Sequence, residues 1–244
     1  MKNLLRSFPD FRQSWPRVVS LAASSVALVV ATTAFSAGPP TVGDAYVYRL
    51  VNGYNKETRG QLRFQVARVE ADRITVSVTP DNAEAGAQHT DVYTQEGNWL
   101  RHPVESHGAK VEYEFATAYP AYVFPLEPGK SWSVRVKATV PGEQRARSVR
   151  VDGRVVGNER IRVPAGEFDT LKIRRFVYPG DKDFMLAETQ IVEFEWYAPA
   201  LGRAVRTERT SSYIDFNRCP EEGPCDSRGD WDVIELIESR VTKR

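Results

Sequence analysis

The sequence has no excess of charge of one sign and few cysteines or histidines. Its 244 residues include 33 Lys and Arg against 32 Asp and Glu, with 2 Cys and 3 His. A nucleic-acid-binding protein needs a basic excess gathered on one face, so this near-neutral charge argues against binding to nucleic acid. Hydrophobic residues make up 41% of the chain and charged residues 27%, which are values typical of globular proteins. We therefore expect a folded chain with little thiol or imidazole chemistry.

The first 37 residues have the features of a secretory signal peptide. Four basic residues precede an uncharged stretch at 18–35, and Ala34 and Ser36 fit the −3 and −1 positions of a cleavage site. An uncleaved membrane anchor is the alternative, because a stretch of this length is at the lower limit for spanning a bilayer. Cleavage would leave one domain, residues 38–244, with 29 basic against 31 acidic residues. We predict a periplasmic or secreted protein with no stable membrane span, and no cysteine near the junction could carry a lipid.

Cys219 and Cys225 are the two cysteines of the chain, in the segment CPEEGPC. Outside the reducing cytosol, two cysteines this close are expected to form a disulfide with each other. Closing so short a loop stabilises a fold by roughly 2 kcal/mol, so the bond would hold a local loop and not the whole domain. The spacing is not CxxC, which disfavours a redox function.

The chain after residue 37 alternates apolar and polar residues as β-strands do. In residues 61–69, Leu62, Phe64 and Val66 share one face, and the slip to Val69 predicts a bulge or a strand end. No segment keeps a period near 3.6, and turn residues such as Asn52-Gly53 recur between the strands. The clearest strand segments are DAYVYRL, QLRFQVARV, DRITVSVT, VEYEFA, SWSVRVKATV, TLKIRRFVY, ETQIVEFEWYA and WDVIELIESRV. We predict an all-β domain, a single curved antiparallel meander of about ten to twelve strands that forms a half-open or closed barrel.

The interior of such a barrel bears on function, because narrow barrels are filled by their own side chains and wider ones can hold a ligand. Aromatic residues make up 11% of the chain. They either form an ordinary core or line a cleft for a lipid-like molecule. The candidate ligand contacts are the aromatic residues on predicted strands: Tyr46, Tyr48, Trp132, Phe194 and Trp196.

Four segments carry a family resemblance: TVGDAYVYRL, FPLEPGKSWSV, VVGNERIRVPAGEFDTLKI and EWYAPALGRAVRTE. They resemble the VGDxWxY start, PLxxGxxW turn, VPAGxF hairpin and WYAPxxG corner of an uncharacterised family of secreted bacterial β proteins, over residues 42–208. Ala45 stands where that family more often has Trp. The resemblance implies a fold related to the curved half-barrels that carry lipoproteins or lipids across the periplasm. It implies no catalytic residue and no cofactor.

Glu193 and Glu195 have a spacing compatible with the carboxylate pair of a glycosidase. They lie on one face of a predicted strand, about 6–7 Å apart along it. A glycosidase pair must instead flank a sugar bond across a cleft. The following hairpin arm carries Arg206 and Arg209, so we predict cross-strand ion pairs on a solvent-exposed face.

Other motifs fall short of a functional site. His89, His102 and His107 have spacings that suit neither a helix nor a strand, and we interpret them as solvated loop residues without a metal. Residues 129–131, Gly-Lys-Ser, lack the first glycine of a phosphate-binding loop, and residues 228–230, Arg-Gly-Asp, match a tripeptide that often arises by chance. No GxSxG elbow is present. We therefore expect a non-enzymatic protein without cofactor or metal.

Two functions are consistent with these observations. The first is an exported, non-catalytic periplasmic protein that binds a hydrophobic or amphipathic, lipid-like ligand on its concave face. The alternative is a cell-envelope module for protein–protein interaction or structure, without a small ligand. An apolar cavity of at least a few hundred cubic ångströms would favour the first function. A filled interior with an exposed strand edge or apolar patch would favour the second.

Overall fold

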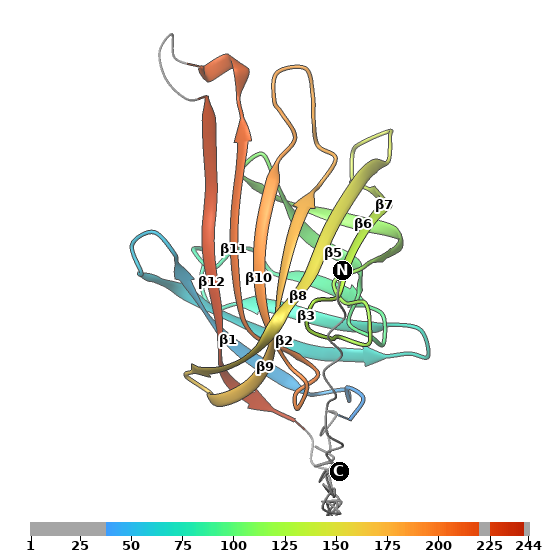
Figure 1. Cartoon of the computed structure of the whole chain (residues 1–244), viewed down its shortest axis with the longest axis vertical. Coiled ribbons are helices and arrows are strands. Elements are labelled where there is room, and N and C mark those ends of the chain that lie inside the picture. Colours follow the sequence, from blue (N-terminus) through green and yellow to red (C-terminus); the bar gives the residue numbers. More distant parts are fainter. Residues whose placement is uncertain (1–37, 220–224, 242–244) are drawn as a thin grey trace, which may run out of the picture. The chain divides into compact units, whose positions relative to one another are not determined.

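The computed structural model describes residues 38–219 and 225–241. The predicted signal peptide, residues 1–37, lies outside the described residues. One short 3-10 helix, η1, spans Phe216–Arg218. The strands are β1 (Ala45–Asn52), β2 (Thr58–Val69), β3 (Ile74–Pro80), β4 (His89–Tyr93), β5 (Trp99–Ser106), β6 (Ala109–Tyr119), β7 (Ser131–Thr139), β8 (Arg147–Val163), β9 (Gly166–Tyr178), β10 (Gln190–Ala198), β11 (Arg203–Ile214) and β12 (Asp226–Arg240) (Figure 1).

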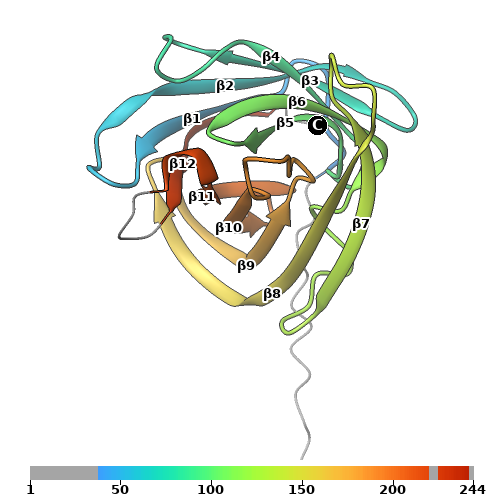
Figure 2. The same ribbon diagram turned by 90° about the horizontal axis from the view of Figure 1, so that it is seen from above.

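The strands form one closed antiparallel barrel. Each strand pairs with its neighbours in the chain, and β1 pairs with β12 to close the ring (Figure 2). This closing pair runs from Ala45 opposite Arg240 to Asn52 opposite Asp232. The structure therefore confirms the predicted antiparallel meander, with twelve strands and a full closure in place of the half-barrel that the family resemblance implied.

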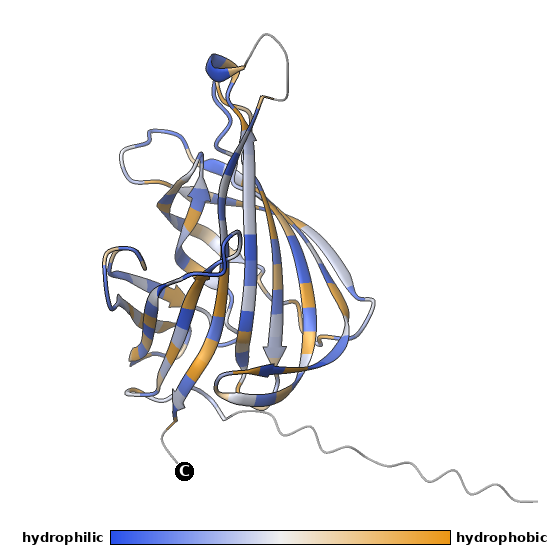
Figure 3. Ribbon diagram, turned by 90° about the vertical axis from the view of Figure 1, so that its left-hand side faces the viewer, coloured by the Kyte–Doolittle hydropathy of each residue, from blue (hydrophilic) through white to orange (hydrophobic). Residues whose placement is uncertain are grey.

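Hydrophobic and hydrophilic residues alternate along the strands of the barrel (Figure 3). In β3, Ile74, Val76 and Val78 are buried, whereas the residues between them are partly exposed. The bulge predicted in the second strand is confirmed, because the β2–β3 register shifts between Val66 and Arg68. β-Branched residues with this spacing fit a half-buried pleated sheet and explain why the segment becomes a strand.

The segment around His102 is a strand, which corrects the prediction of a loop. β5 contains Pro103, a residue that removes a backbone donor and normally argues against a strand interior. The structure tolerates it because β5 pairs with β4 at only two positions, Arg101 with Val92 and Trp99 with Tyr93. Pairing with β6 is more extensive and holds the strand in place.

One part of the barrel interior is filled with side chains. Buried residues of β5–β10 pack there, and Tyr113, Val149 and Val151 are fully inaccessible to solvent. This group, which we call the packed end, is completed by Val104, Phe115, Tyr119, Ala121, Val136, Ala138, Val140, Val177 and Ile191. The remaining interior, beside β1–β4 and β10–β12, contains the cavity described below.

The predicted VPAGxF hairpin connects β8 and β9. The β8–β9 turn ends at Gly166, whose φ of 135° is one that side-chain-bearing residues rarely adopt. The tip of this hairpin reaches β12, where the Ala165 N–H donates to the carbonyl of Leu236 at 3.0 Å. Leu236 is fully buried beneath it. The hairpin thus packs over the barrel wall beside β10 and β11.

The predicted disulfide is present between Cys219 and Cys225, with their Cα atoms 4.5 Å apart. It closes the connection between η1 and β12. Nearby, the Asp215 N–H donates to the carbonyl of Cys225. In the described part of the chain, no helix is long and apolar enough to cross a membrane.

Candidate functional site

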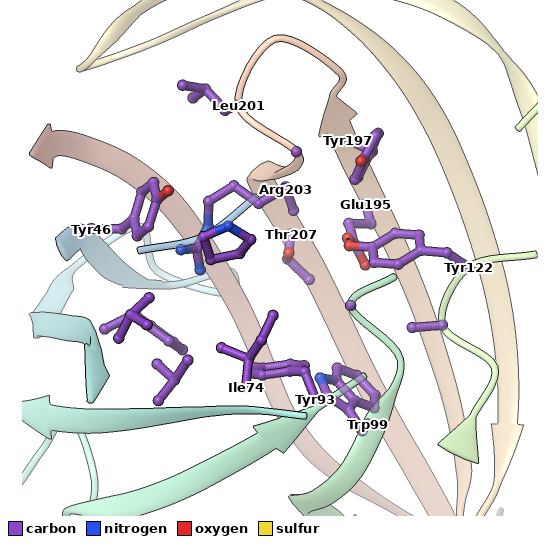
Figure 4. Close-up of a pocket in the computed structure, with 18 of the residues that line it drawn as sticks. Tyr46, Ile74, Tyr93, Trp99, Tyr122, Glu195, Tyr197, Leu201, Arg203 and Thr207 are labelled. Atoms are coloured by element: carbon purple, nitrogen blue, oxygen red, sulfur yellow. The ribbon is translucent and has the colours of Figure 1, made fainter. Parts of the chain in front are cut away.

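A cavity of about 800 Å³ occupies the interior of the barrel (Figure 4). One wall consists of apolar side chains that β2 and β3 turn inward: Leu62, Phe64, Val66, Ile74, Val76 and Val78. Alternation along both strands places these residues on one face, as the sequence predicted for β2. Tyr93 and Trp99 continue this wall, and segments outside the strands, including residues 38–41 and 200–202, complete the lining. The volume lies within the usual range for small-molecule sites.

A buried ionic cluster forms the opposite wall. Arg175 of β9 is fully buried, and its guanidinium donates to Glu193, at 3.2 Å, and to Glu195. Arg209 of β11 donates to the other oxygen of Glu193 at 2.9 Å. Tyr122 donates its hydroxyl hydrogen to Glu195, next to Tyr197 in Figure 4. Two carboxylates and two guanidiniums therefore balance in charge.

This cluster corrects the prediction that Glu193 and Glu195 lie on a solvent-exposed face. Their side chains are 3% and 6% exposed and face the barrel interior. The predicted cross-strand pair between Glu193 and Arg209 is confirmed, at 2.9 Å. Arg206 instead pairs with Glu208 and Glu235. The carboxylates tolerate burial because each one meets a guanidinium, which compensates for the loss of water.

Burial and charge act in opposite directions on the ionisable groups of the cluster. Burial favours the neutral form of Glu193, but Arg175 and Arg209 outweigh it and lower its pKa to about 2. Burial and the adjacent Glu195 both raise the pKa of Tyr122 well above its ordinary value. Glu193 is therefore an anion at neutral pH, and Tyr122 remains a hydrogen-bond donor.

Arg203, at the start of β11, projects into the cavity between the apolar wall and the ionic cluster (Figure 4). Its guanidinium lies over Tyr46 at 3.7 Å from the ring centre, with Tyr48 and Phe64 at 5.4 and 5.8 Å. Its Nε has no hydrogen-bond partner. Burial disfavours the charged form, but Tyr48 and Tyr46 outweigh it and raise the pKa of Arg203, which stays charged.

His89 and His102, which line the cavity, meet at the fully buried Asp91. Nδ1 of His102 lies 2.9 Å from Asp91, and Nε2 of His89 lies 3.5 Å from the same carboxylate. Burial raises the pKa of Asp91, but His102 outweighs this effect and lowers it below the ordinary value. The ring of His102 stacks on Trp99 at 4.0 Å. These two histidines are thus partly buried cavity residues and not the solvated loop residues that we expected.

His107 lies apart from this pair. Its Nε2 approaches the carbonyl of Ala187 at 2.9 Å and Asp181 at 3.6 Å. Within residues 38–219 and 225–241, no three His, Cys, Asp or Glu side chains are grouped to hold a metal ion. In the same ranges, neither His89 nor His102 bonds to a hydroxyl or thiol that could act as a nucleophile.

Of the five predicted ligand contacts, two line the cavity and three do not. Tyr46 and Tyr48 line the cavity, where they flank Arg203. Phe194 and Trp196 alternate with the inward Glu193 and Glu195 and do not line it. Lys172 lies over both of these rings, at 5.6 and 4.6 Å from their centres. Phe194 and Trp196 therefore belong to the opposite face of β10.

Trp132 does not line the cavity either. It covers Gly153, its partner across the β7–β8 pair, and its indole N–H donates to the carbonyl of Pro120 at 3.1 Å. An aromatic ring over a cross-strand glycine stabilises a sheet where the glycine offers no side chain. Trp132 is therefore placed as a structural residue of this strand pair.

The sequence did not identify Arg203 as a cavity residue. Thr207 and Arg209 share the cavity face of β11 by alternation, and Arg209 was expected to pair with a glutamate on the neighbouring arm. Arg203 lies beyond a register shift at Val205, which does not line the cavity, so alternation along the strand does not place Arg203 on this face. The inward direction of that face could not be read, because basic residues normally point to solvent.

The sequence matches no protein-family model, and no curated protein matches it. The resemblance based on the four segments therefore stays a prediction. Among solved structures, the chain is similar to a candidate lipoprotein from Parabacteroides distasonis, with 16% identity, 83% of this chain and 97% of that chain covered, and a TM-score of 0.48. It is also similar to a candidate exported protein with a YmcC-like fold from Bacteroides fragilis, with 14% identity, coverages of 84% and 99%, and a TM-score of 0.44.

A third similar structure is the hypothetical lipoprotein YmcC from Escherichia coli. Its identity is 10%, the coverages are 80% of this chain and 84% of that chain, and the TM-score is 0.43. None of the three descriptions names a ligand or an activity.

Proposed function

We propose that the protein is a non-catalytic binding protein of the cell envelope, whose barrel holds a hydrophobic or amphipathic, lipid-like molecule. The observation that carries the proposal is the cavity of about 800 Å³ with its apolar β2–β3 wall. Binding sites for small molecules combine a mainly apolar lining with a few precisely placed polar groups. The leader-like first 37 residues support the envelope location.

The chemistry of the cavity supports binding over catalysis. The polar groups of the ionic cluster are committed to one another, since Glu193 and Glu195 each contact a guanidinium. A general acid or base needs a pKa near the working pH. The pKa of Glu193, at about 2, lies far from neutrality. The cluster therefore fixes the shape and polarity of a wall.

The test is to identify what the protein carries when it is purified from its native host. Organic extraction and mass spectrometry should recover a lipid-like compound at close to one molecule per chain. Leu62→Trp adds a large ring to the cavity wall and should reduce the recovered compound several-fold. Val156→Trp adds the same ring at a position that is 50% exposed on β8 and should leave recovery unchanged.

Recovery of no compound from the wild-type protein, with no binding of added lipids, would overturn the proposal. A stoichiometric protein partner without lipid would favour the alternative of an envelope interaction module. Equal recovery from wild type and Leu62→Trp would place the bound compound outside the cavity.

A further inference from the structure

Most charged groups that face the cavity are neutralised within the protein. Glu193 and Glu195 contact Arg175 and Arg209, as described above. Lys110 pairs with Asp232 at 3.1 Å. Asp91 faces the two histidines, and Asp44 accepts the Thr41 N–H at 2.8 Å. Each of these groups is satisfied by the protein itself.

Arg203 is the exception among the cationic groups of the lining. Among the described residues, no carboxylate lies within 4 Å of its guanidinium. The nearby carboxylates pair with other cations, such as Arg175, Arg206 and Arg209. A charge withdrawn from water is costly unless it is paired. Cation–π contacts with Tyr46 and Tyr48 offset part of this cost.

The geometry leaves the Arg203 guanidinium without an anionic partner and its Nε without a hydrogen-bond partner. A guanidinium is planar, and its N–H groups point outward in that plane. The ring of Tyr46 covers a face of the guanidinium, and the hydroxyls of Tyr46 and Tyr48 are its hydrogen-bond partners, but both are neutral groups. The edge of a guanidinium is the part that grips carboxylate and phosphate oxygens, frequently through two parallel hydrogen bonds.

We propose that the ligand of the cavity is an amphipathic anion, whose acidic head group binds Arg203 and whose apolar chain lies along the β2–β3 wall. This inference rests on the proposed function and names the ligand class. Arg175 and Arg209 do not compete for the head group, because Glu193 and Glu195 already occupy them. Leu62, Phe64 and Ile74 provide the adjoining apolar surface.

The test compares three probes with the same sixteen-carbon chain: palmitate, hexadecyl phosphate and neutral hexadecanol. Their affinities for the delipidated full-length chain are measured by tryptophan fluorescence, since Trp99 lines the cavity. A hydrogen bond to a charged group contributes roughly 1.5–3 kcal/mol, so an acidic probe should bind about tenfold or more tightly than hexadecanol. Comparing the affinities of palmitate and hexadecyl phosphate shows whether the site prefers a carboxylate or a phosphate head group.

Two variants assign this preference to Arg203. Arg203→Met should reduce the preference for acidic probes to about twofold or less while hexadecanol still binds, and Arg203→Lys should keep part of it. Arg174→Met is the matched control, because Arg174 also lies over an aromatic ring, at 4.9 Å from the centre of Phe176, but does not line the cavity. It should bind all three probes like the wild type.

The outcomes separate this inference from the proposed function. Equal binding of palmitate, hexadecyl phosphate and hexadecanol to the wild type would overturn the anionic head group and leave lipid binding intact. Failure of all three probes to bind would overturn both proposals. Loss of hexadecanol binding in Arg203→Met would show that Arg203 supports the cavity wall and would overturn its role as head-group site. All variants carry the same first 37 residues, so differences between them arise in the barrel.

Discussion

Glu193 is a residue whose charge depends on its neighbours. Burial alone would keep its carboxyl protonated, yet Arg175 and Arg209 lower its pKa to about 2. The unfolded chain takes up a proton here near the ordinary value of 4.5, so the folded form binds it less readily. By linkage, this ionisation contributes about 3 kcal/mol to stability above pH 4.5, and the contribution is lost as the pH falls towards 2.

We therefore predict that Glu193→Gln lowers the free energy of unfolding most at neutral pH. The difference between wild type and variant should shrink as the pH falls from 4.5 towards 2, because both proteins are then neutral at this position. Urea unfolding of both proteins at several pH values from 2 to 7 measures the difference and cancels the contributions of other carboxyls. A difference that is constant over this range would contradict the assignment.

The sequence predicted that Glu193 and Glu195 share one face of the strand, but not that this face points into the barrel. Between them and beyond lie Phe194 and Trp196, which by hydrophobicity alone should point to the core. In the structure both faces of β10 are covered. Glu193 and Glu195 face the cavity, where Arg175 contacts both and Arg209 contacts Glu193. Phe194 and Trp196 pack in an apolar cluster on the other face, where cationic side chains also lie over their rings. Such compensation by partners far along the chain cannot be deduced from the pattern of one strand.

At the level of elements, the β7–β8 pair depends on a contact between a ring and a backbone. Trp132 lies so close over Gly153 that a Cβ added to the glycine would meet the indole at 2.1 Å. Gly157, further along β8, has no atom within 4 Å of such a Cβ. Gly157 therefore serves as a control for a substitution at Gly153, because both lie on β8 and only Gly153 is covered by a ring.

We predict that Gly153→Ala lowers the free energy of unfolding by about 1–3 kcal/mol, as overpacking does, because Trp132 must move. Gly157→Ala should leave stability within about 0.5 kcal/mol of the wild type or raise it slightly. Chemical denaturation measures both. In the background of Trp132→Ala, the cost of Gly153→Ala should largely disappear, and an unchanged cost would show that the clash is not with the ring.

Prediction of the strands succeeded where alternation was regular and failed where local chemistry interrupted it. β2 and β3 follow the expected pattern, and even the bulge after Val66 was detectable. β5 was missed because Pro103 and three polar or charged neighbours resemble a loop. Its strand conformation comes from pairing with β6, which runs from Ser106 opposite Ala109, beside the turn, to Trp99 opposite Tyr119. Tertiary pairing of this kind overrides local preference.

At the level of the whole molecule, the sequence predicted a curved antiparallel meander, but it did not determine whether the barrel closes or contains a cavity. Closure depends on the pairing of β1 with β12, which lie at opposite ends of the domain sequence. The cavity depends on how much of the interior is filled. Aromatic and valine side chains fill the packed end of the barrel, whereas valine, isoleucine, leucine and phenylalanine side chains of β2 and β3 face open space. Because similar residue types occur in both regions, only their placement distinguishes a filled interior from a cavity.

This division predicts opposite responses to a larger side chain. Val149 is fully buried in the packed end, so Val149→Phe forces neighbours such as Tyr113 and Val136 apart and should cost about 1–3 kcal/mol of unfolding free energy. Leu62 borders the cavity, and Leu62→Trp can place its ring in free space at a cost of less than about 1 kcal/mol. Thermal and urea unfolding of the delipidated proteins measure the contrast. Equal destabilisation by the two substitutions would show that the interior beside β2 and β3 is as closely packed as the other end, because a cavity wall and a filled core cannot respond alike to added volume.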